Sequence, residues 1–330
     1  MKAIVVTEFG GPEVLKYMDV EKPALQSKQV LIRVATTSVN FADVKARYGN
    51  YHGAGQPPFI PGLDAAGVVE AVGSEVKSVK VGERVIAFPK NGSYAEYVTA
   101  DEELVFVLPD NIDFDTAAAC PTVAFTSYKL LADVARLVPG ETVVIHAAAG
   151  GIGTTAIQLA KILGAGLVIG TVSNENKIPA VLEAGADHVI CYETEDFAEK
   201  VNELTGGRGA DVILDSISGW VAEKSMACLA YYGRLVNFGN AAGGMVGQIK
   251  TTDLHSSCRS ILGFSLGTTR DKRPHLLRDT AAHVLSYLAE GRLKMQIGAR
   301  YSIEEAAQAH HLIESRQSRG KILLHVRSAE

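Results

Sequence analysis

Hydrophobic residues recur with two different periods along this chain, and the change of period divides it into regions. Between Lys28 and about Leu108, short β-branched runs alternate with Gly and Pro. These runs predict strands at residues 30–39, 67–72, 84–88 and 94–99. Short strands separated by turn residues are typical of an all-β fold, here a small irregular barrel.

The period changes at about Phe125, where helical patterns begin to alternate with strand-like runs. Six apolar runs predict strands at residues 143–145, 167–172, 188–191, 211–215, 234–238 and 261–266. The first helical pattern between them ends at Gly164 and places four apolar residues on one face: Ala156, Leu159, Ala160 and Leu163. Six strands in βα alternation predict an α/β fold with a doubly wound parallel sheet.

The region after Gly267 has too few strands to form a domain by itself. Its pattern predicts a helix at residues 275–290, a second helix at residues 303–316 and a final strand at residues 321–326. The second helix is preceded by Ser302-x-x-Glu305, which fits a capping box.

We therefore expect this last region to pack on the N-terminal barrel. The predicted organisation is one domain of residues 1–124 and 268–330, with a second domain of residues 125–267 inserted into it. The length of 330 residues agrees with this, because a single domain usually has roughly 100–200 residues.

Charge and hydropathy narrow the range of partners. The net charge is 32 − 37 = −5, and no basic run occurs, so we expect neither nucleic acid nor an acidic membrane as a partner. No apolar stretch approaches the roughly 18 residues of a spanning helix, and Glu8 follows the first apolar run too early for a secretory signal. The sequence predicts a cytoplasmic protein.

The four cysteines are far apart in the sequence and form no Cys-x-x-Cys pair. This spacing predicts buried free thiols at Cys120, Cys191, Cys228 and Cys258.

The strongest chemical signal is the turn that follows the first strand of the inserted domain. Residues 147–153 read Ala-Ala-Ala-Gly-Gly-Ile-Gly and open a helical pattern. Small residues let the backbone approach a phosphate, and the helix N-terminus favours an anion. A dinucleotide pyrophosphate is expected on Ala149, Gly150, Gly151, Ile152 and Gly153; the alternative is a tight turn that binds nothing.

Several further motifs occur in an order that is similar to a known family. They are Gly10-Gly11-Pro12-Glu13-Val14-Leu15, Val39-Asn40-Phe41-Ala42-Asp43, Pro61-Gly62-x-Asp64-x-Ala66-Gly67, Val81-Gly82-Glu83-Arg84-Val85 and Phe238-Gly239-Asn240. Together with the glycine turn, they resemble the zinc-independent quinone oxidoreductase branch of the medium-chain dehydrogenase/reductase superfamily. The resemblance implies a GroES-like catalytic domain with an inserted Rossmann domain, NADPH as cofactor, and a homodimer.

Zinc is not expected, although the alcohol dehydrogenases of the same superfamily use it. The chain has no cysteine before Cys120, and its only histidine before His146 is His52. Where those enzymes have Gly-His-Glu, this chain reads Gly62-Leu63-Asp64. Because a tetrahedral zinc site needs converging thiolate, imidazole or carboxylate ligands, we expect hydride transfer to an acceptor that needs no metal.

The resemblance also implies the catalytic residues. Asn40 and Asp43 correspond to positions that face the nicotinamide, Phe41 between them is assigned to cofactor binding, and Tyr51 lies where related enoyl reductases place a tyrosine near the substrate. For Asn40 and Asp43 the alternative is an Asx turn that ends the strand. For Tyr51 the alternative is a loop tyrosine packed over apolar surface.

Cofactor choice is decided after the second strand of the inserted domain. An NAD enzyme normally has an acidic residue there, but this strand ends at Ser173, and Lys177 matches a family position that contacts the 2′-phosphate of NADP. NADPH is therefore expected, although Glu175 lies nearby; a solvated lysine at a helix start is the alternative for Lys177.

The remaining predicted cofactor contacts follow other strands of the fold. Phe238, Gly239 and Asn240 end the fifth strand of the inserted domain, at the carboxyl edge where doubly wound sheets bind ligands. The family places the other three near the dinucleotide: Thr126, Tyr192 and Lys321. A helix N-cap is the alternative for Thr126, and a solvent-facing side chain is the alternative for Lys321.

Three histidines are interpreted as structural. His146 is expected to be a satisfied core residue, and the pair His310 and His311 is expected on a helix surface.

Three functions remain open from the sequence. The first is an NADPH-dependent quinone reductase without zinc, the second is a 2-enoyl thioester or enone reductase, and the third is a non-catalytic NADPH-binding protein of the sensor or crystallin type. Asn40, Asp43 and Tyr51 near the expected site favour an enzyme.

Overall fold

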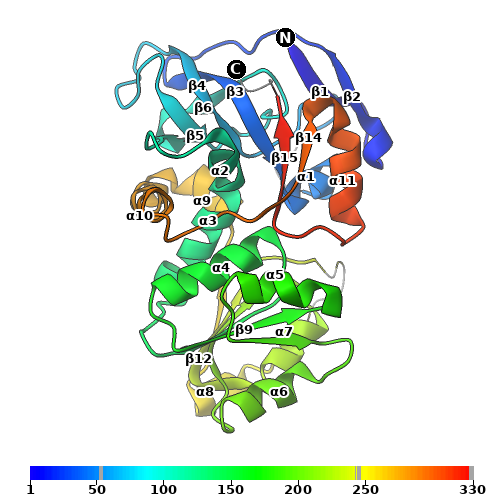
Figure 1. The fold of residues 1–330 in the computed structure, drawn as a ribbon, viewed down its shortest axis with the longest axis vertical. Helices are drawn as coiled ribbons and strands as arrows, with labels where there is room; N and C mark the ends of the chain where they lie inside the picture. Colours follow the sequence, from blue (N-terminus) through cyan, green and yellow to red (C-terminus); the bar gives the residue numbers. More distant parts are fainter. Residues whose placement is uncertain (52–54, 242, 244–246, 327–330) are drawn as a thin grey trace. The chain divides into compact units, whose positions relative to one another are not determined.

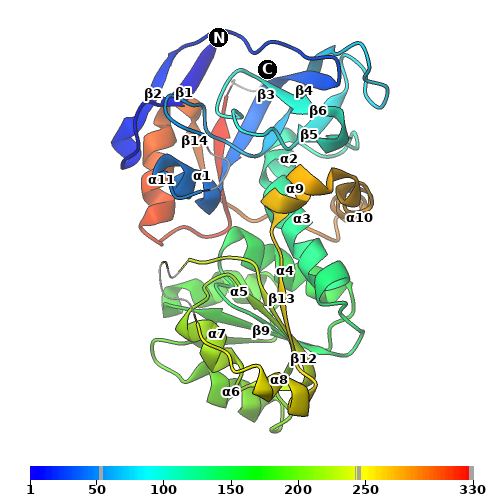
Figure 2. The same cartoon turned by 180° about the vertical axis from the view of Figure 1, so that it is seen from behind.

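Each of the two regions with different hydrophobic periods forms its own structural unit. The computed structural model describes residues 1–51, 55–241, 243 and 247–326. One unit contains Met1–Phe125 and Thr268–Glu330, and the other contains Thr126–Gly267 (Figures 1 and 2).

The first unit is built on a seven-stranded sheet. Its order is β14-β15-β3-β4-β5-β7, with β6 paired to β3. All pairs are antiparallel except β14 with β15. The strands are β3 (Gln29–Val39), β4 (Ala65–Val72), β5 (Arg84–Ala87), β6 (Tyr97–Asp101), β7 (Val105–Val107), β14 (Ile297–Ser302) and β15 (Lys321–His325).

A separate hairpin and short helices complete this unit. Strands β1 (Lys2–Val6) and β2 (Leu15–Asp19) pair with each other. The helices are α1 (Phe41–Arg47), α2 (Phe114–Ala119), α10 (Leu277–Ala289) and α11 (Ala306–Glu314). The β-branched residues that predicted the barrel strands form a core, which includes Val30, Ile32, Val34, Val69 and Val85.

The second unit contains the predicted parallel sheet. Its order is β10-β9-β8-β11-β12-β13, with every neighbouring pair parallel. In chain order this is 3-2-1-4-5-6, the order of a Rossmann fold. The strands are β8 (Thr142–Ile145), β9 (Leu167–Val172), β10 (His188–Cys191), β11 (Ala210–Asp215), β12 (Leu229–Asn237) and β13 (Ser260–Gly263).

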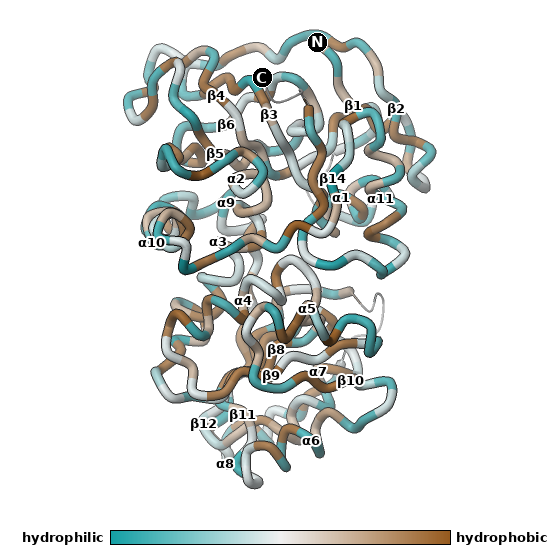
Figure 3. The backbone as a smooth tube through the Cα atoms, viewed as in Figure 1, coloured by the Kyte–Doolittle hydropathy of each residue, from teal (hydrophilic) through white to brown (hydrophobic). Residues whose placement is uncertain are grey.

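Helices cover this sheet and bury its apolar residues. They are α4 (Gly151–Ile162), α5 (Ile178–Glu183), α6 (Phe197–Leu204), α7 (Trp220–Ser225) and α8 (Thr252–Ser257). Of the four residues on the predicted face of α4, Ala156, Leu159 and Ala160 are fully buried, and Leu163 is the half-buried C-cap. Gly164, with φ +91°, follows the end of this helix. The tube through β8 and β9 is mainly hydrophobic in Figure 3, as expected for strands buried on both faces.

Two helices carry the chain across the unit boundary. They are α3 (Pro121–Tyr128), which continues into a π-helical turn at Lys129–Val134, and α9 (Leu266–Lys272).

The structure differs from the predicted elements at one strand end and in several elements that were not predicted. The strand predicted at residues 261–266 is β13, which ends at Gly263, and Leu266 begins α9. Strands β1, β2 and β14 and helix α1 were not predicted. β14 alternates half-buried and exposed residues, and α1 has only seven, so neither leaves a strong pattern.

The capping box at Ser302 is confirmed. The Ser302 N–H donates to Glu305 Oε2 at 2.8 Å, and a 3₁₀ turn (Ile303–Glu305) precedes α11. Among the described residues, no helix has the length and apolar character needed to cross a membrane.

Candidate active site

The glycine turn lies between the carboxyl end of β8 and the start of α4. Within this turn the left-handed residue is Ala147, with φ +52°, rather than a glycine. Gly150 is the exposed N-cap of α4 and has an extended backbone. The first N–H groups of a helix have no partner within it, so those of Gly151, Ile152 and Gly153 point toward the space before the helix.

A glycine is required at position 153, because the backbone there lies very close to the backbone of Ala148. A Cβ at this position would lie 2.5 Å from Ala148 Cα and closer still to its carbonyl oxygen. At Gly150, by contrast, the nearest atom to a Cβ would be Ala147 O at 3.4 Å. The third glycine therefore lets α4 begin directly against the end of β8, which brings the helix N-terminus to the edge of the sheet.

The end of β9 carries no acidic residue. β9 ends at Val172, Ser173 is half-buried, and Asn174 caps a 3₁₀ turn (Glu175–Lys177) by accepting from Asn176 N–H at 2.8 Å. Glu175 is exposed and Lys177 is half-buried at the end of this turn.

Further predicted residues follow β10 and β12 at the same edge of the sheet. Tyr192 follows β10 and packs against Trp220 with ring centroids 5.9 Å apart. Phe238 and Gly239 follow β12 and are half-buried, while Asn240 is exposed. Because the carboxyl ends of parallel strands share one edge, these residues lie along the edge that contains the glycine turn.

Two other residues of this unit, Thr126 and His146, are buried inside it. Thr126 is buried inside α3, which begins at Pro121, so the N-cap alternative is wrong. His146 is a satisfied core residue, as predicted: its ring nitrogens hydrogen-bond to Thr171 Oγ1 at 2.8 Å and Ser225 Oγ at 3.0 Å. Burial lowers the pKa of His146 to about 4.

In the first unit, Asn40 lies at the junction of β3 and α1. Its Oδ1 accepts from Lys321 Nζ at 2.7 Å, and its Nδ2 donates to Asp64 Oδ2 at 2.8 Å. Its backbone N–H donates to Asp43 Oδ2 at 2.8 Å. An Asx turn would explain neither side-chain contact, so tertiary contacts orient the amide.

Asp64 and Lys321 are the centre of this buried network. Asp64 Oδ1 accepts from the N–H and hydroxyl of Thr122 at 3.1 and 2.6 Å, and its Oδ2 lies 3.5 Å from Lys321 Nζ. Ser38 Oγ also donates to Asp64 Oδ2, at 2.9 Å. Asp64 is 0% and Lys321 3% exposed, so the solvent-facing alternative for Lys321 is wrong. Burial lowers the pKa of Lys321, against the influence of the Asp64 and Asp43 carboxylates.

Asp43 is a buried carboxyl group with an unusual proton affinity. Burial raises its pKa to about 7, and the nearby Asp64 charge adds to the rise, while the N–H groups of Asn40 and Gly62 and the charge of Lys321 oppose it. A carboxyl group with a pKa near 7 is half-protonated at neutral pH and is suited to holding a proton there.

A chain of buried polar groups extends from Asp43 to α11. The Tyr94 hydroxyl lies 3.1 Å from His310 Nε2, and burial together with the nearby Asp43 charge raises the pKa of its phenol. His310 Nδ1 lies 3.0 Å from Arg47 Nη1 and must accept, because arginine has no acceptor. His310 is 0% exposed and its pKa is lowered to about 3 by burial, so the expected surface position of His310 is wrong; His311 is exposed as predicted.

Tyr51 and Phe41 lie at the border of this network. Tyr51 is half-buried, and burial raises the pKa of its phenol, while the positive charge of Arg270 lowers it. Phe41, at the start of α1, is exposed, and Lys45 Nζ lies 5.6 Å from its ring centroid.

Sequence reasoning did not assign a role to Thr122, Asp64 or Arg270 at this site. Asp64 was noted in the Pro61–Gly67 motif and as a departure from Gly-His-Glu, without a role, and Arg270 lies in a helix that was not predicted. The sequence does not show the roles of these residues, because their partners are far away in the chain.

The four cysteines differ in their exposure. Cys120, Cys191 and Cys228 are buried as predicted, but Cys258 is exposed, which corrects the prediction for that residue. Burial raises the pKa of the Cys120 thiol far above its usual range. Among the residues described by the structure, no three His, Cys, Asp or Glu side chains form a group that could hold a metal; His52 lies outside the described residues.

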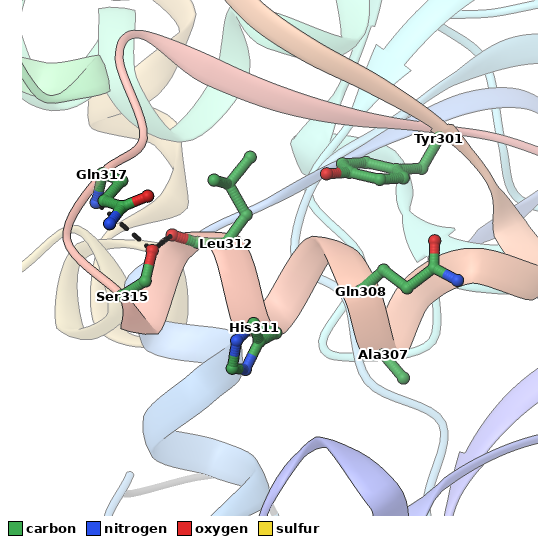
Figure 4. A pocket seen from close by; sticks show the side chains of 7 residues that line it. All are labelled: Tyr301, Ala307, Gln308, His311, Leu312, Ser315 and Gln317. Atoms are coloured by element: carbon green, nitrogen blue, oxygen red, sulfur yellow. Dashed lines mark hydrogen bonds between the residues drawn. The ribbon is translucent and has the colours of Figure 1, made fainter.

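A hollow on the outer side of α11 contains none of the predicted site residues. Figure 4 shows it beside Tyr301 and Leu312, with Ser315 Oγ donating to Leu312 O at 2.8 Å. Its lining is neutral apart from His311, so it offers no group for proton or hydride chemistry.

The raised pKa of Asp43 predicts a pH-dependent contribution to stability. The folded pKa of about 7 lies above the unfolded value near 3.9, so the contribution is complete below pH 4 and is lost as pH rises through 7. We expect the unfolding free energy of the wild type, relative to Asp43→Asn, to fall by about 2–3 kcal/mol between pH 5 and 7.5. Urea unfolding of both proteins at each pH measures this fall.

The difference in unfolding free energy between the wild type and Asp43→Asn separates the contribution of Asp43 from that of the buried histidines. His146 and His310 have lowered pKa values and give both proteins the opposite slope, with stability rising up to about pH 6.5. Parallel stability curves for the wild type and the variant would contradict the prediction.

Comparison with known proteins identifies relatives over nearly the whole chain. Residues 26–110 match the model of the alcohol dehydrogenase GroES-like domain, and residues 151–282 match that of the zinc-binding dehydrogenases. A quinone oxidoreductase of Pseudomonas aeruginosa is 38% identical over 98% of this chain and 99% of its own.

Solved structures show the same likeness. The Pseudomonas syringae quinone oxidoreductase superposes with a TM-score of 0.90 and is 35% identical, covering 98% of this chain and 99% of its own. The Escherichia coli quinone oxidoreductase, solved as a complex with NADPH, has a TM-score of 0.88 and 32% identity, covering 98% of this chain and all of its own.

Proposed function

The chain belongs to the quinone oxidoreductase branch of the medium-chain dehydrogenase/reductase superfamily, and we propose that it reduces quinones with NADPH and without zinc. The observation that carries this proposal is the glycine turn at the edge of a Rossmann sheet, next to a β9 end without an acidic residue. The NADPH complex of the Escherichia coli relative supports it.

The second unit fits a dinucleotide with a 2′-phosphate. Gly153 leaves room for the close approach of α4, and the free N–H groups at the start of this helix suit a pyrophosphate. Ser173 and Lys177 replace the acidic residue that would bind both ribose hydroxyls, and a lysine favours a phosphate there.

When bound, the reduced nicotinamide supplies a hydride to the acceptor. Reduction of a quinone to a hydroquinone takes this hydride and one proton, so the protein must manage the proton and orient the reactants. Asn40 is suited to orientation, because Lys321 and Asp64 hold its amide in one position, and its second amide N–H has no partner among the described residues.

Tyr51 donates a hydrogen bond to the acceptor oxygen in this proposal. Its raised pKa keeps the phenol protonated at neutral pH. Asp43 is only 1% exposed and acts as a positioning residue: it accepts from Asn40 N–H and holds the first turn of α1.

The proposal needs no zinc, because the carboxylate of Asp64 is already engaged by Ser38, Asn40 and Thr122. With the family we also propose a homodimer in the cytoplasm; sedimentation of the purified protein tests the dimer.

The test of the function is NADPH oxidation with a quinone, an enone and an enoyl thioester in parallel, with and without a chelator. We expect the highest kcat/KM with the quinone and no effect of the chelator. Faster turnover of the enoyl thioester would indicate an enoyl reductase, and tight NADPH binding without turnover would indicate a sensor.

Lys177 is expected to select NADPH over NADH. A charge-assisted hydrogen bond to the 2′-phosphate is worth about 1.5–3 kcal/mol, so Lys177→Ala should raise the Kd of NADPH roughly 10- to 100-fold and leave that of NADH unchanged. Fluorescence titration measures both constants. Lys200→Ala, on α6 of the same unit, is the control for loss of a positive charge; an equal loss for both cofactors in Lys177→Ala would show that Lys177 does not contact the phosphate.

A further inference from the structure

Arg270 on α9 is a partly buried guanidinium group with an incomplete set of partners. One of its terminal nitrogens donates to Pro89 O, and its Nε is buried without a hydrogen-bond partner among the described residues. An unsatisfied buried donor is costly, and a structure that retains one needs an explanation.

Two other arginines with little solvent exposure are paired with carboxylates. Arg47 pairs with Glu314 at 2.7 Å and also bonds to Gly10 O and His310. Arg234 binds both oxygens of Glu141, at 2.8 and 2.6 Å. Arg270 has no carboxylate within ion-pair distance in the described parts of the chain, so it is the exception among these three.

The guanidinium of Arg270 is nevertheless held in one orientation. Its carbon lies 5.0 Å from the centroid of the Phe88 ring, and the contact to Pro89 O fixes one edge. A guanidinium that stacks on an aromatic ring and is bonded at one edge presents its other donors in a fixed plane.

Arg270 also acts on the residues of the proposed active site in the same unit. Its charge interacts with those of Asp64 and Asp43 and with the phenol of Tyr51, the residue proposed to donate to the acceptor. Both carboxylates accept from other donors, and among the described residues neither forms an ion pair or hydrogen bond with Arg270.

We propose that Arg270 forms a subsite for a carboxylate on the electron acceptor. A planar guanidinium binds the two oxygens of a carboxylate side by side. The inference rests on the proposed function and narrows its substrate to quinones or related acceptors that carry a carboxylate. The carboxylate itself is unchanged in the reaction: the hydride and one proton from water convert the quinone to the hydroquinone, and NADPH becomes NADP⁺.

The first test is binding without turnover. Calorimetric titration of the NADP⁺-loaded protein compares benzoate with benzamide, which has the same shape and no charge. We expect benzoate to bind the wild type about 10- to 100-fold more tightly, and Arg270→Met to remove this preference. Arg270→Gln serves as a second neutral variant if the methionine variant does not fold, and Arg273→Met, an exposed arginine nearby, is the matched control.

The second test is activity with a matched pair of acceptors. For Arg270→Met we expect kcat/KM to fall about 10- to 100-fold with 1,4-naphthoquinone-2-carboxylate and less than about threefold with 1,4-naphthoquinone. Equal binding of benzoate and benzamide to the wild type, or a benzoate preference that survives in the Arg270 variants, would overturn the subsite.

These outcomes are separable from a failure of the proposed function. If the wild type reduces the neutral quinone but shows no benzoate preference, the quinone reductase stands and the subsite does not. If neither quinone is reduced, the proposed function fails, and the benzoate titration still decides the role of Arg270.

Discussion

Replacement of Lys321 by methionine is expected to lower the free energy of unfolding by about 3–5 kcal/mol. The substitution removes the cation that lies 3.5 Å from Asp64 Oδ2 and donates to Asn40 Oδ1 at 2.7 Å. It leaves a fully buried carboxylate without its counter-charge, and burial of such a charge is strongly unfavourable. Urea unfolding of the variant beside the wild type measures the loss.

Two further variants establish the cause. Lys28→Met removes a lysine from the exposed pair with Glu75 and should leave the midpoint of unfolding nearly unchanged. Lys321→Met with Asp64→Asn removes both charges, so it should recover part of the loss. A single Lys321→Met variant as stable as Lys28→Met would show that the buried pair is not formed as described.

Gly153→Ala is expected to disturb both the stability and the dinucleotide site of the second unit. Its new Cβ would lie 2.5 Å from Ala148 Cα, and backbone atoms cannot move aside as a side chain can. The start of α4 must therefore shift away from β8, at a cost of at least about 1–3 kcal/mol. Because the free N–H groups of the helix move with it, the Kd for NADPH should rise about tenfold or more.

Gly263→Ala is the matched control for this substitution. A Cβ at Gly263 meets nothing within 4 Å, and its backbone has no positive φ. Its unfolding curve and its NADPH titration should match those of the wild type. If Gly153→Ala behaves like this control, the close approach of α4 to β8 is not what the turn requires.

Local patterns predicted the second unit closely. The runs at residues 167–172 and 188–191 are β9 and β10, and the apolar face of α4 is buried as its spacing indicated. Such patterns are reliable because each strand of a parallel sheet is buried on both faces and each helix on one. The spacing of apolar residues along the chain therefore reflects which residues are buried. Strand β14, at an edge and only half-buried, left no such pattern.

The glycine turn was identified from its residues, but the function of each residue in it was not. The left-handed position is Ala147, and Gly153 is needed for packing rather than for its φ. A sequence shows which residues are small, whereas only the folded backbone shows which small residue is close to another segment.

The sequence by itself determined the fold class, the position of the glycine turn and the absence of an acidic residue at the end of β9, because each of these depends on neighbours in the chain. Only the tertiary structure decided that Lys321 and His310 are buried, that Asn40 is held between Lys321 and Asp64, and that Arg270 lacks a full set of partners. Lys321 and Asn40 are 281 residues apart, and Arg47 and His310 are 263 apart. Whether a polar side chain is solvated or buried with a partner is decided by residues that the fold brings together over such separations, and no local pattern records them.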